Sequence, residues 1–150
     1  MRWIIEDIKP VIDRDFRTIP FRECTGIGGS SMGGIMALYG AVHYNRWFSK
    51  AACISSAIGF CMRPLMADMR ASQMNPDTRM YLSWGTREAW GIQDPTKPDR
   101  SSRSYKWNRQ AADILADKGA KTMLYCQVEG HHCEADWEKQ DPIFMDFLWK

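Results

Sequence analysis

Residues 28–34 (GGSSMGG) constrain this chain more than any other segment, because they place a serine between glycines in a G-x-S-x-G frame. Ser31 has Gly29 two residues before it and Gly33 two residues after it, whereas Ser30 lacks a glycine at the later position. A nucleophilic serine on a sharp strand-to-helix turn needs a very small residue at both places, since a larger side chain would clash with the nearby backbone. The frame selects Ser31 as the candidate nucleophile. A glycine-rich turn with a capping serine is the structural alternative.

The residues on either side of this turn supply the context that the motif requires. Residues 24–28 are short and uncharged, which predicts a buried strand. Residues 32–44 are rich in helix-forming residues and carry apolar side chains at helical spacing. A strand, a glycine turn, a serine and a helix in this order indicate a nucleophile-bearing turn.

Strands and helices are expected to alternate along the rest of the chain. The opening residues carry an apolar helical stripe, and Pro10 is expected to kink that helix or to begin a second one. Further strands are predicted over residues 51–56, 79–84 and 122–128, and helices over parts of 62–74, over 102–118 and over 134–149. This alternation predicts an α/β fold with a mostly parallel sheet and helices on both faces. The length is that of a single domain, residues 1–150.

A serine nucleophile needs a base, and the three histidines are the first candidates. His43 lies at the end of the helix after Ser31, where a structural role is the simpler interpretation. His131 and His132 directly follow the last predicted strand. They are expected at the carboxyl edge of the sheet, where open α/β folds gather their ligands.

The orienting acid is expected in the loop after residues 79–84. Glu88 lies just beyond that strand, and Asp94 and Asp99 are rivals on the same loop. With Glu88 as the acid, the candidates follow the chain as Ser31, Glu88, His132. That order is the one found in α/β hydrolases.

Three segments of the chain resemble the putative-esterase family of α/β hydrolases, which includes esterase D-like, feruloyl and enterochelin esterases. They are residues 8–18 (IKPVIDRDFRT), residues 28–34 (GGSSMGG) and residues 130–137 (GHHCEADW). The chain resembles the C-terminal part of the proteins of that family. In the family pattern the catalytic histidine stands two residues before a glutamate, and His132 has this position here. The family pattern also has a glycine followed, after two residues, by Asp or Glu, and Glu88 has that position here. It implies a serine carboxylic-ester hydrolase with a Ser31–His132–Glu88 triad, an acyl-enzyme intermediate and no cofactor.

The front of the chain departs from that family, whose members have several strands before the helix that opens this sequence. The resemblance therefore implies an N-terminally truncated domain. The backbone N–H of Met32 is expected to be one oxyanion-hole donor, and the second donor is expected on the absent part. Activity is then expected to be weak or lost, since one such donor contributes about 10²- to 10³-fold in rate. The strand before Ser31 is expected to be an exposed edge, through which chains could pair as a homo-oligomer.

Three alternatives belong to other classes. A zinc site would use the donor side chains His131, His132, Cys133 and Cys126, although their spacing fits no usual zinc motif. A non-catalytic binding or structural fragment would keep the turn only as a fold element. An acyltransferase would use the same triad with an alcohol in place of water.

Composition narrows the classes of partner that the chain is expected to bind. A formal charge of +2 does not favour nucleic acid, and no apolar run approaches the roughly 20 residues that span a bilayer. Five cysteines without regular spacing favour reduced thiols and a cytoplasmic location, although any signal peptide would precede Met1. The expected partner is a small-molecule ester with an acyl or carbohydrate part. Trp90, Tyr105 and Trp107 are candidates to line its pocket, with core packing as the simpler alternative.

Overall fold

The computed structural model describes residues 1–88 and 94–150, and Trp90 therefore lies outside the described residues. The helices and strands follow one another as η1 (Ile4–Ile8), α1 (Lys9–Asp15), η2 (Arg22–Cys24), β1 (Gly26–Ser30), α2 (Met32–His43), β2 (Lys50–Ile54), η3 (Ile58–Phe60), α3 (Met62–Ala71), β3 (Arg79–Gly85), α4 (Arg103–Asp117), β4 (Lys121–Gln127), α5 (Glu134–Trp137), η4 (Glu138–Gln140) and α6 (Asp141–Trp149). The predicted alternation of strands and helices is confirmed.

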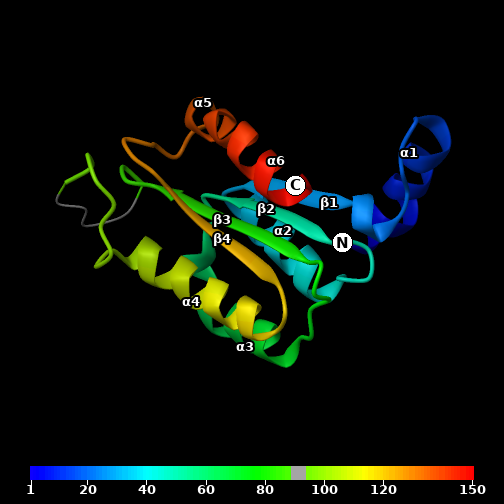
Figure 1. Ribbon diagram of the computed structural model, residues 1–150, viewed down its shortest axis with the longest axis horizontal. Helices are drawn as coiled ribbons and strands as arrows, with labels where there is room; N and C mark the ends of the chain where they lie inside the picture. The colour runs from blue at the N-terminus through cyan, green and yellow to red at the C-terminus, as the bar shows by residue number, and fades with distance from the viewer. Residues whose placement is uncertain (89–93) are drawn as a thin grey trace.

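Four strands of the described residues form one parallel sheet in the order β1-β2-β3-β4. Each strand is joined to the next strand in the sheet by a right-handed crossover. Because the strands are added in one direction across the sheet, the crossover helices all lie on the same face of it. Accordingly, α2, α3 and α4 cover one face of the sheet, and α6 covers the other (Figure 1). The loops after β3 and β4 meet the start of α4 at the edge shown on the left of Figure 1.

Each face of the sheet has its own hydrophobic core. Alternate residues of a strand point to opposite faces. In β2 this sends Ala51 and Cys53 into the core under α2, α3 and α4, and Ala52 and Ile54 into the core under α6. In β3, Tyr81 is fully buried under α6, where its hydroxyl donates a hydrogen bond to Gln140 Oε1 (3.0 Å). The sheet is thus fixed from both sides.

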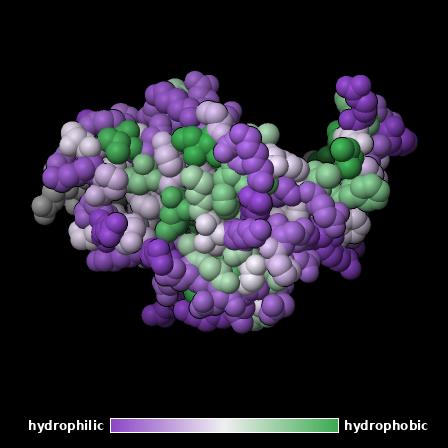
Figure 2. Space-filling view, viewed as in Figure 1, coloured by the Kyte–Doolittle hydropathy of each residue, from purple (hydrophilic) through white to green (hydrophobic). Residues whose placement is uncertain are grey.

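The first helix projects from the body of the molecule (Figure 1). Its π-helical turn η1 precedes Pro10, which stands in the first turn of α1, so the expected effect of this proline is confirmed. Hydrophobic residues are visible on this projecting segment in Figure 2. Trp3 and Phe16 of residues 1–16 are largely exposed. Among the described residues, no helix has the length and apolar character needed to cross a membrane.

The last helix is broken, unlike the continuous helix predicted over residues 134–149. The short α5 passes through the 3₁₀ turn η4 into α6, which has Pro142 in its first turn. Proline has no backbone N–H to continue the preceding helical hydrogen bonds, so it favours a new helix start. The prediction of one amphipathic helix was wrong at this point.

Candidate active site

Ser31 lies on the turn between β1 and α2 with a backbone conformation that is unusual for a side-chain-bearing residue. Its φ is 55° and its ψ is −119°. Its N–H donates to the Ile54 carbonyl oxygen (3.0 Å), and its own carbonyl accepts from the Ala57 N–H (3.1 Å). A residue with a side chain in such a conformation costs on the order of 1–3 kcal/mol and is held there by its surroundings. The end of β2 therefore fixes the backbone of Ser31.

The two glycines of the frame differ in their surroundings. A Cβ atom built on Gly29 would lie 2.6 Å from the backbone C and O of Gly33, closer than real Cβ contacts allow. A Cβ atom built on Gly33 meets nothing within 4 Å among the described residues. The expectation that both positions must be small to avoid a clash is therefore wrong for Gly33. The close approach of strand and helix requires glycine at position 29.

His132 lies in the loop after β4, and its ring reaches Ser31. The Nε2 atom of His132 is 2.8 Å from Ser31 Oγ. The imidazole packs edge-on against the buried Trp137 ring, with centroids 4.9 Å apart and planes at 89°. Such an arrangement orients a ring while leaving its nitrogens free to bond.

Glu88, in the loop after β3, completes the cluster on the other side of His132. Its Oε2 is 3.4 Å from His132 Nδ1, and its side chain is only 9% exposed. Its Oε1 accepts a hydrogen bond from Ser55 Oγ (2.7 Å). The structure thus brings Ser31, His132 and Glu88 together from three separate loops. The Glu88–His132 distance is longer than a strong hydrogen bond.

The rival acids are engaged elsewhere. Asp94 accepts from the Thr96 hydroxyl (2.6 Å) and pairs with Lys97 (2.9 Å), and both lower the pKa of its carboxyl well below its usual range. Asp99 accepts from the backbone and hydroxyl of Ser101, which also lower its carboxyl pKa. The structure does not bring either carboxylate to His132.

Ser55, whose hydroxyl supports Glu88, was not predicted from the sequence. Ser55 is buried, has a φ of 42°, and its N–H donates to Ser83 Oγ (3.2 Å). A hydroxyl directly after the carboxyl end of a strand was the available signal. Its role depends on which loop lies opposite, and the order of residues along the chain does not reveal that.

Met32 is the first residue of α2, directly after Ser31. The first N–H groups of a helix have no acceptor within it and carry the positive end of the helix dipole. The Met32 side chain is exposed, and Met32 is not among the residues that line the cavity beside Ser31. Its assignment as an oxyanion donor stays a prediction.

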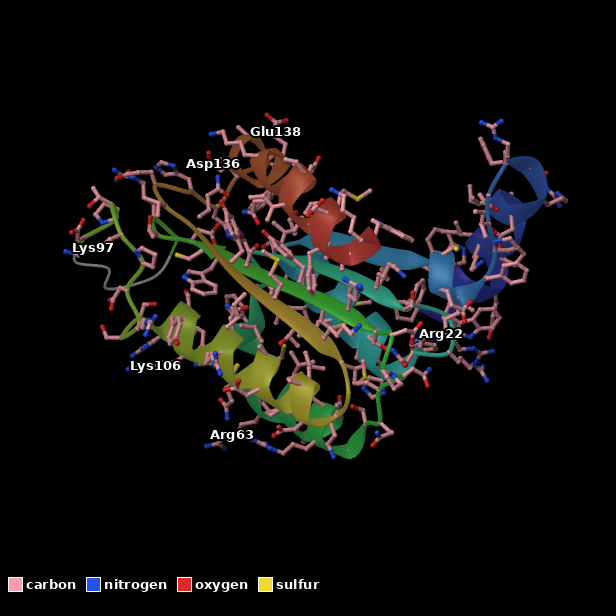
Figure 3. The ribbon with its side chains drawn as sticks, in the orientation of Figure 1. Arg22, Arg63, Lys97, Lys106, Asp136 and Glu138 are labelled. Atoms are coloured by element: carbon pink, nitrogen blue, oxygen red, sulfur yellow. The ribbon has the colours of Figure 1, made fainter. Side chains whose placement is uncertain are left out.

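The side chains of the zinc alternative have other partners, and His131 and Cys133 both contact Asp136. His131 Nδ1 lies 3.1 Å from Asp136, which also pairs with Lys139, while His132 bonds to Ser31. Asp136 and its neighbourhood are at the upper left of Figure 3. Burial, with a smaller contribution from Glu88, raises the pKa of the Cys126 thiol to about 11. Within residues 1–88 and 94–150, no three His, Cys, Asp or Glu side chains form a metal-binding group.

A cavity of about 550 Å³ opens beside the cluster, within the size range of small-molecule sites. Ser31, Glu88 and His132 are in its lining, as is Trp107. Tyr105 is not in the lining and instead packs edge-on against Trp84. Of the two described aromatic candidates, only Trp107 lines the cavity.

Comparison with known proteins shows the family of the chain. A family model described as "Esterase: Putative esterase" matches residues 2–142, and the chain belongs to that family. No curated protein sequence matches the chain.

Solved structures of low sequence identity share the fold. They include an enterochelin esterase from Shigella flexneri (TM-score 0.72, 18% identity, 98% of this chain and 36% of that chain). An IroE-like serine hydrolase from Shewanella oneidensis has a TM-score of 0.68 at 18% identity, over 97% of this chain and 46% of that chain. A ferulic acid esterase has a TM-score of 0.65 at 13% identity, over 98% of this chain and 60% of that chain. The protein therefore has an α/β-hydrolase fold, and it spans between about a third and three fifths of these structures.

Proposed function

We propose that this protein is a serine carboxylic-ester hydrolase in which Ser31 is the nucleophile, His132 the base and Glu88 the orienting acid. The observation that carries the proposal is the 2.8 Å contact between His132 Nε2 and Ser31 Oγ, at a serine held with positive φ. Membership of the esterase family supports ester hydrolysis as the reaction class.

In the proposed reaction, Ser31 Oγ attacks the ester carbonyl carbon while its proton passes to His132 Nε2. His132 then gives that proton to the leaving alkoxide, and an acyl group stays on Ser31. Water attacks this acyl-enzyme with the same base, which releases the acid and restores the serine. Glu88 holds the imidazole in the tautomer with a proton on Nδ1 and stabilises the imidazolium. The Met32 N–H donates to the carbonyl oxygen as it becomes an oxyanion.

Hydrolysis of 4-nitrophenyl butyrate tests this proposal. The wild-type chain is expected to release 4-nitrophenol, and Ser31→Ala is expected to reduce the rate to the level without enzyme, because no acyl-enzyme can form. Equal rates for wild type and Ser31→Ala would contradict the proposal. Absence of turnover by a folded wild type would favour a non-catalytic fragment instead.

Exchange of Glu88 tests which carboxylate is the acid. Glu88→Gln is expected to lower kcat by about 10⁴-fold, because a neutral amide cannot stabilise the imidazolium. Asp94→Asn and Asp99→Asn are the matched controls, and they are expected to keep nearly the full rate. The assay is the same ester hydrolysis, with the fold of each variant checked by circular dichroism. A larger loss in either control than in Glu88→Gln would transfer the role to that aspartate.

The partner and the location follow from this proposal. The substrate is a small-molecule ester with an acyl or carbohydrate part. The five cysteines are free thiols, which supports a reducing compartment such as the cytoplasm.

Strand β1 pairs with β2 on one side and lies at the edge of the described sheet. Its other side is the surface through which a homo-oligomer would form.

A further inference from the structure

The cavity beside Ser31 combines aromatic walls with polar atoms. Trp84, Trp107 and Phe60 contribute rings to the lining, and Ile58 adds an aliphatic side chain. Gly59 allows η3 to approach α4, since a Cβ atom there would lie 2.4 Å from the Trp107 ring. The cavity is therefore bounded by η3, the end of β3 and the first turns of α4.

One cation lies in this lining without a matching anion. Arg103 is the first residue of α4 and lines the cavity together with Ser31 and His132. No ion pair of Arg103 is found among residues 1–88 and 94–150. Glu88 is the one carboxylate in the described lining, and it is already engaged by His132 and Ser55. The positive charge of Arg103 thus remains available to a ligand.

The surroundings of Arg103 add to this positive potential. Lys106, labelled on α4 in Figure 3, lies one turn further along the same helix. The first turn of α4 contributes the positive end of the helix dipole. The acidic side chains of the preceding loop are held by other groups, Asp94 by Lys97 and Asp99 by Ser101. Lys97 offsets the negative charge of Asp94, whereas Ser101 does not offset that of Asp99, so an anion would be drawn to Arg103 itself rather than to the preceding loop.

Two further atoms of the cavity residues lack hydrogen-bond partners. Asn108 is 2% exposed, and its Nδ2 donates to the Ser104 carbonyl while its Oδ1 has no partner among the described residues. The buried Oγ of Ser56 likewise has none. Buried polar atoms are normally satisfied by hydrogen bonds, so Asn108 Oδ1 and Ser56 Oγ leave unused hydrogen-bonding capacity within the wall of the cavity, where neighbouring atoms cover them.

We propose that the cavity selects esters bearing a carboxylate besides the ester group, with Arg103 as the residue that recognises it. This inference rests on the proposed function. A guanidinium binds a carboxylate by two parallel hydrogen bonds, and the aromatic walls accommodate the apolar part between the carboxylate and the scissile bond. Arg103 is a specificity-determining residue in this account and takes no part in the proton transfers at Ser31.

Matched esters test the proposal. In one arm the charge is on the acyl side (4-nitrophenyl hemisuccinate against 4-nitrophenyl butyrate). In the other it is on the alcohol side (4-carboxyphenyl butyrate against phenyl butyrate). In at least one arm, the ratio of kcat/KM for charged over neutral ester is expected to fall about tenfold in Arg103→Gln, as for a charge-assisted hydrogen bond partly screened by water. Arg103→Lys is expected to keep part of the ratio, and added salt to reduce it.

Arg100→Gln is the control, because Arg100 is exposed, lies three residues earlier and is outside the cavity lining. It is expected to leave the ratios unchanged. Unchanged ratios in Arg103→Gln in both arms, or the same fall in Arg100→Gln, would overturn the proposal.

A binding measurement separates this inference from the proposed function. Binding of the same four esters to Ser31→Ala is followed by isothermal titration calorimetry, with and without Arg103→Gln. Tighter binding of a charged ester that depends on Arg103, without turnover by wild type, would support the carboxylate site and contradict the esterase. Turnover with unchanged ratios in both arms would support the esterase and contradict the site. Absence of both turnover and Arg103-dependent binding would contradict both.

Discussion

Replacement of His132 by alanine is expected to lower kcat/KM for 4-nitrophenyl butyrate by about 10⁵-fold, since nucleophile and base act as one unit. His132 Nε2 is 2.8 Å from Ser31 Oγ, and no other imidazole among the described residues reaches that hydroxyl. Without this base, the Ser31 hydroxyl keeps its proton and is a poor nucleophile. Steady-state kinetics over a wide range of enzyme concentration would measure the loss.

His131→Ala is the matched control for this prediction. His131 is adjacent in sequence, but its ring bonds to Asp136 and is 60% exposed. Its removal is expected to cost far less activity than removal of His132. Thermal unfolding of both variants would separate loss of the base from loss of the loop. Equal losses of activity in two equally stable variants would contradict the assignment of the base.

Introduction of a methyl group at Gly29 is expected to have the largest effect on stability. A Cβ atom there would lie 2.6 Å from the backbone of Gly33, and neither segment has a flexible side chain that could move aside. Overpacking of this kind costs about 3 kcal/mol of unfolding free energy. Urea unfolding of Gly29→Ala followed by circular dichroism would measure the loss.

Gly33→Ala is its control, because the same methyl group at position 33 meets no described atom within 4 Å. A change of no more than about 1 kcal/mol is expected, with a favourable sign, since alanine loses less backbone entropy than glycine in a helix. Similar destabilisation by the two substitutions would show that the turn does not have the described close approach.

The order of strands and helices was predictable because the apolar residues of each segment follow the period of its structure. The boundaries of the glycine-rich strand β1 were harder to predict. This strand was predicted at residues 24–28 and is observed at Gly26–Ser30. Three of its five residues are glycines, so it has little side-chain pattern to read. Further along, β4 was predicted at residues 122–128 and is found at Lys121–Gln127. Its alternating side chains fixed its position to within one residue.

The candidate site was predictable at its main points and not in its supporting contacts. Ser31 carries a local motif, and His132 and Glu88 follow strand ends, so their approach follows from the topology of a parallel sheet. Ser55, by contrast, acts through a contact between separate loops. Local sequence carries no record of such pairs. Likewise, the interpretation of Arg103 depends on the cavity that η3 and α4 form together.

Labelling with a fluorophosphonate tests most directly whether Ser31 is an activated nucleophile, because the reagent phosphonylates serines that a neighbouring base activates. Mass spectrometry of the intact wild-type chain is expected to show one adduct, and peptide mapping is expected to place it on Ser31. Ser31→Ala is expected to stay unlabelled, and His132→Ala to react far more slowly. A folded wild-type chain that stays unlabelled, or an adduct that persists in Ser31→Ala, would contradict the account.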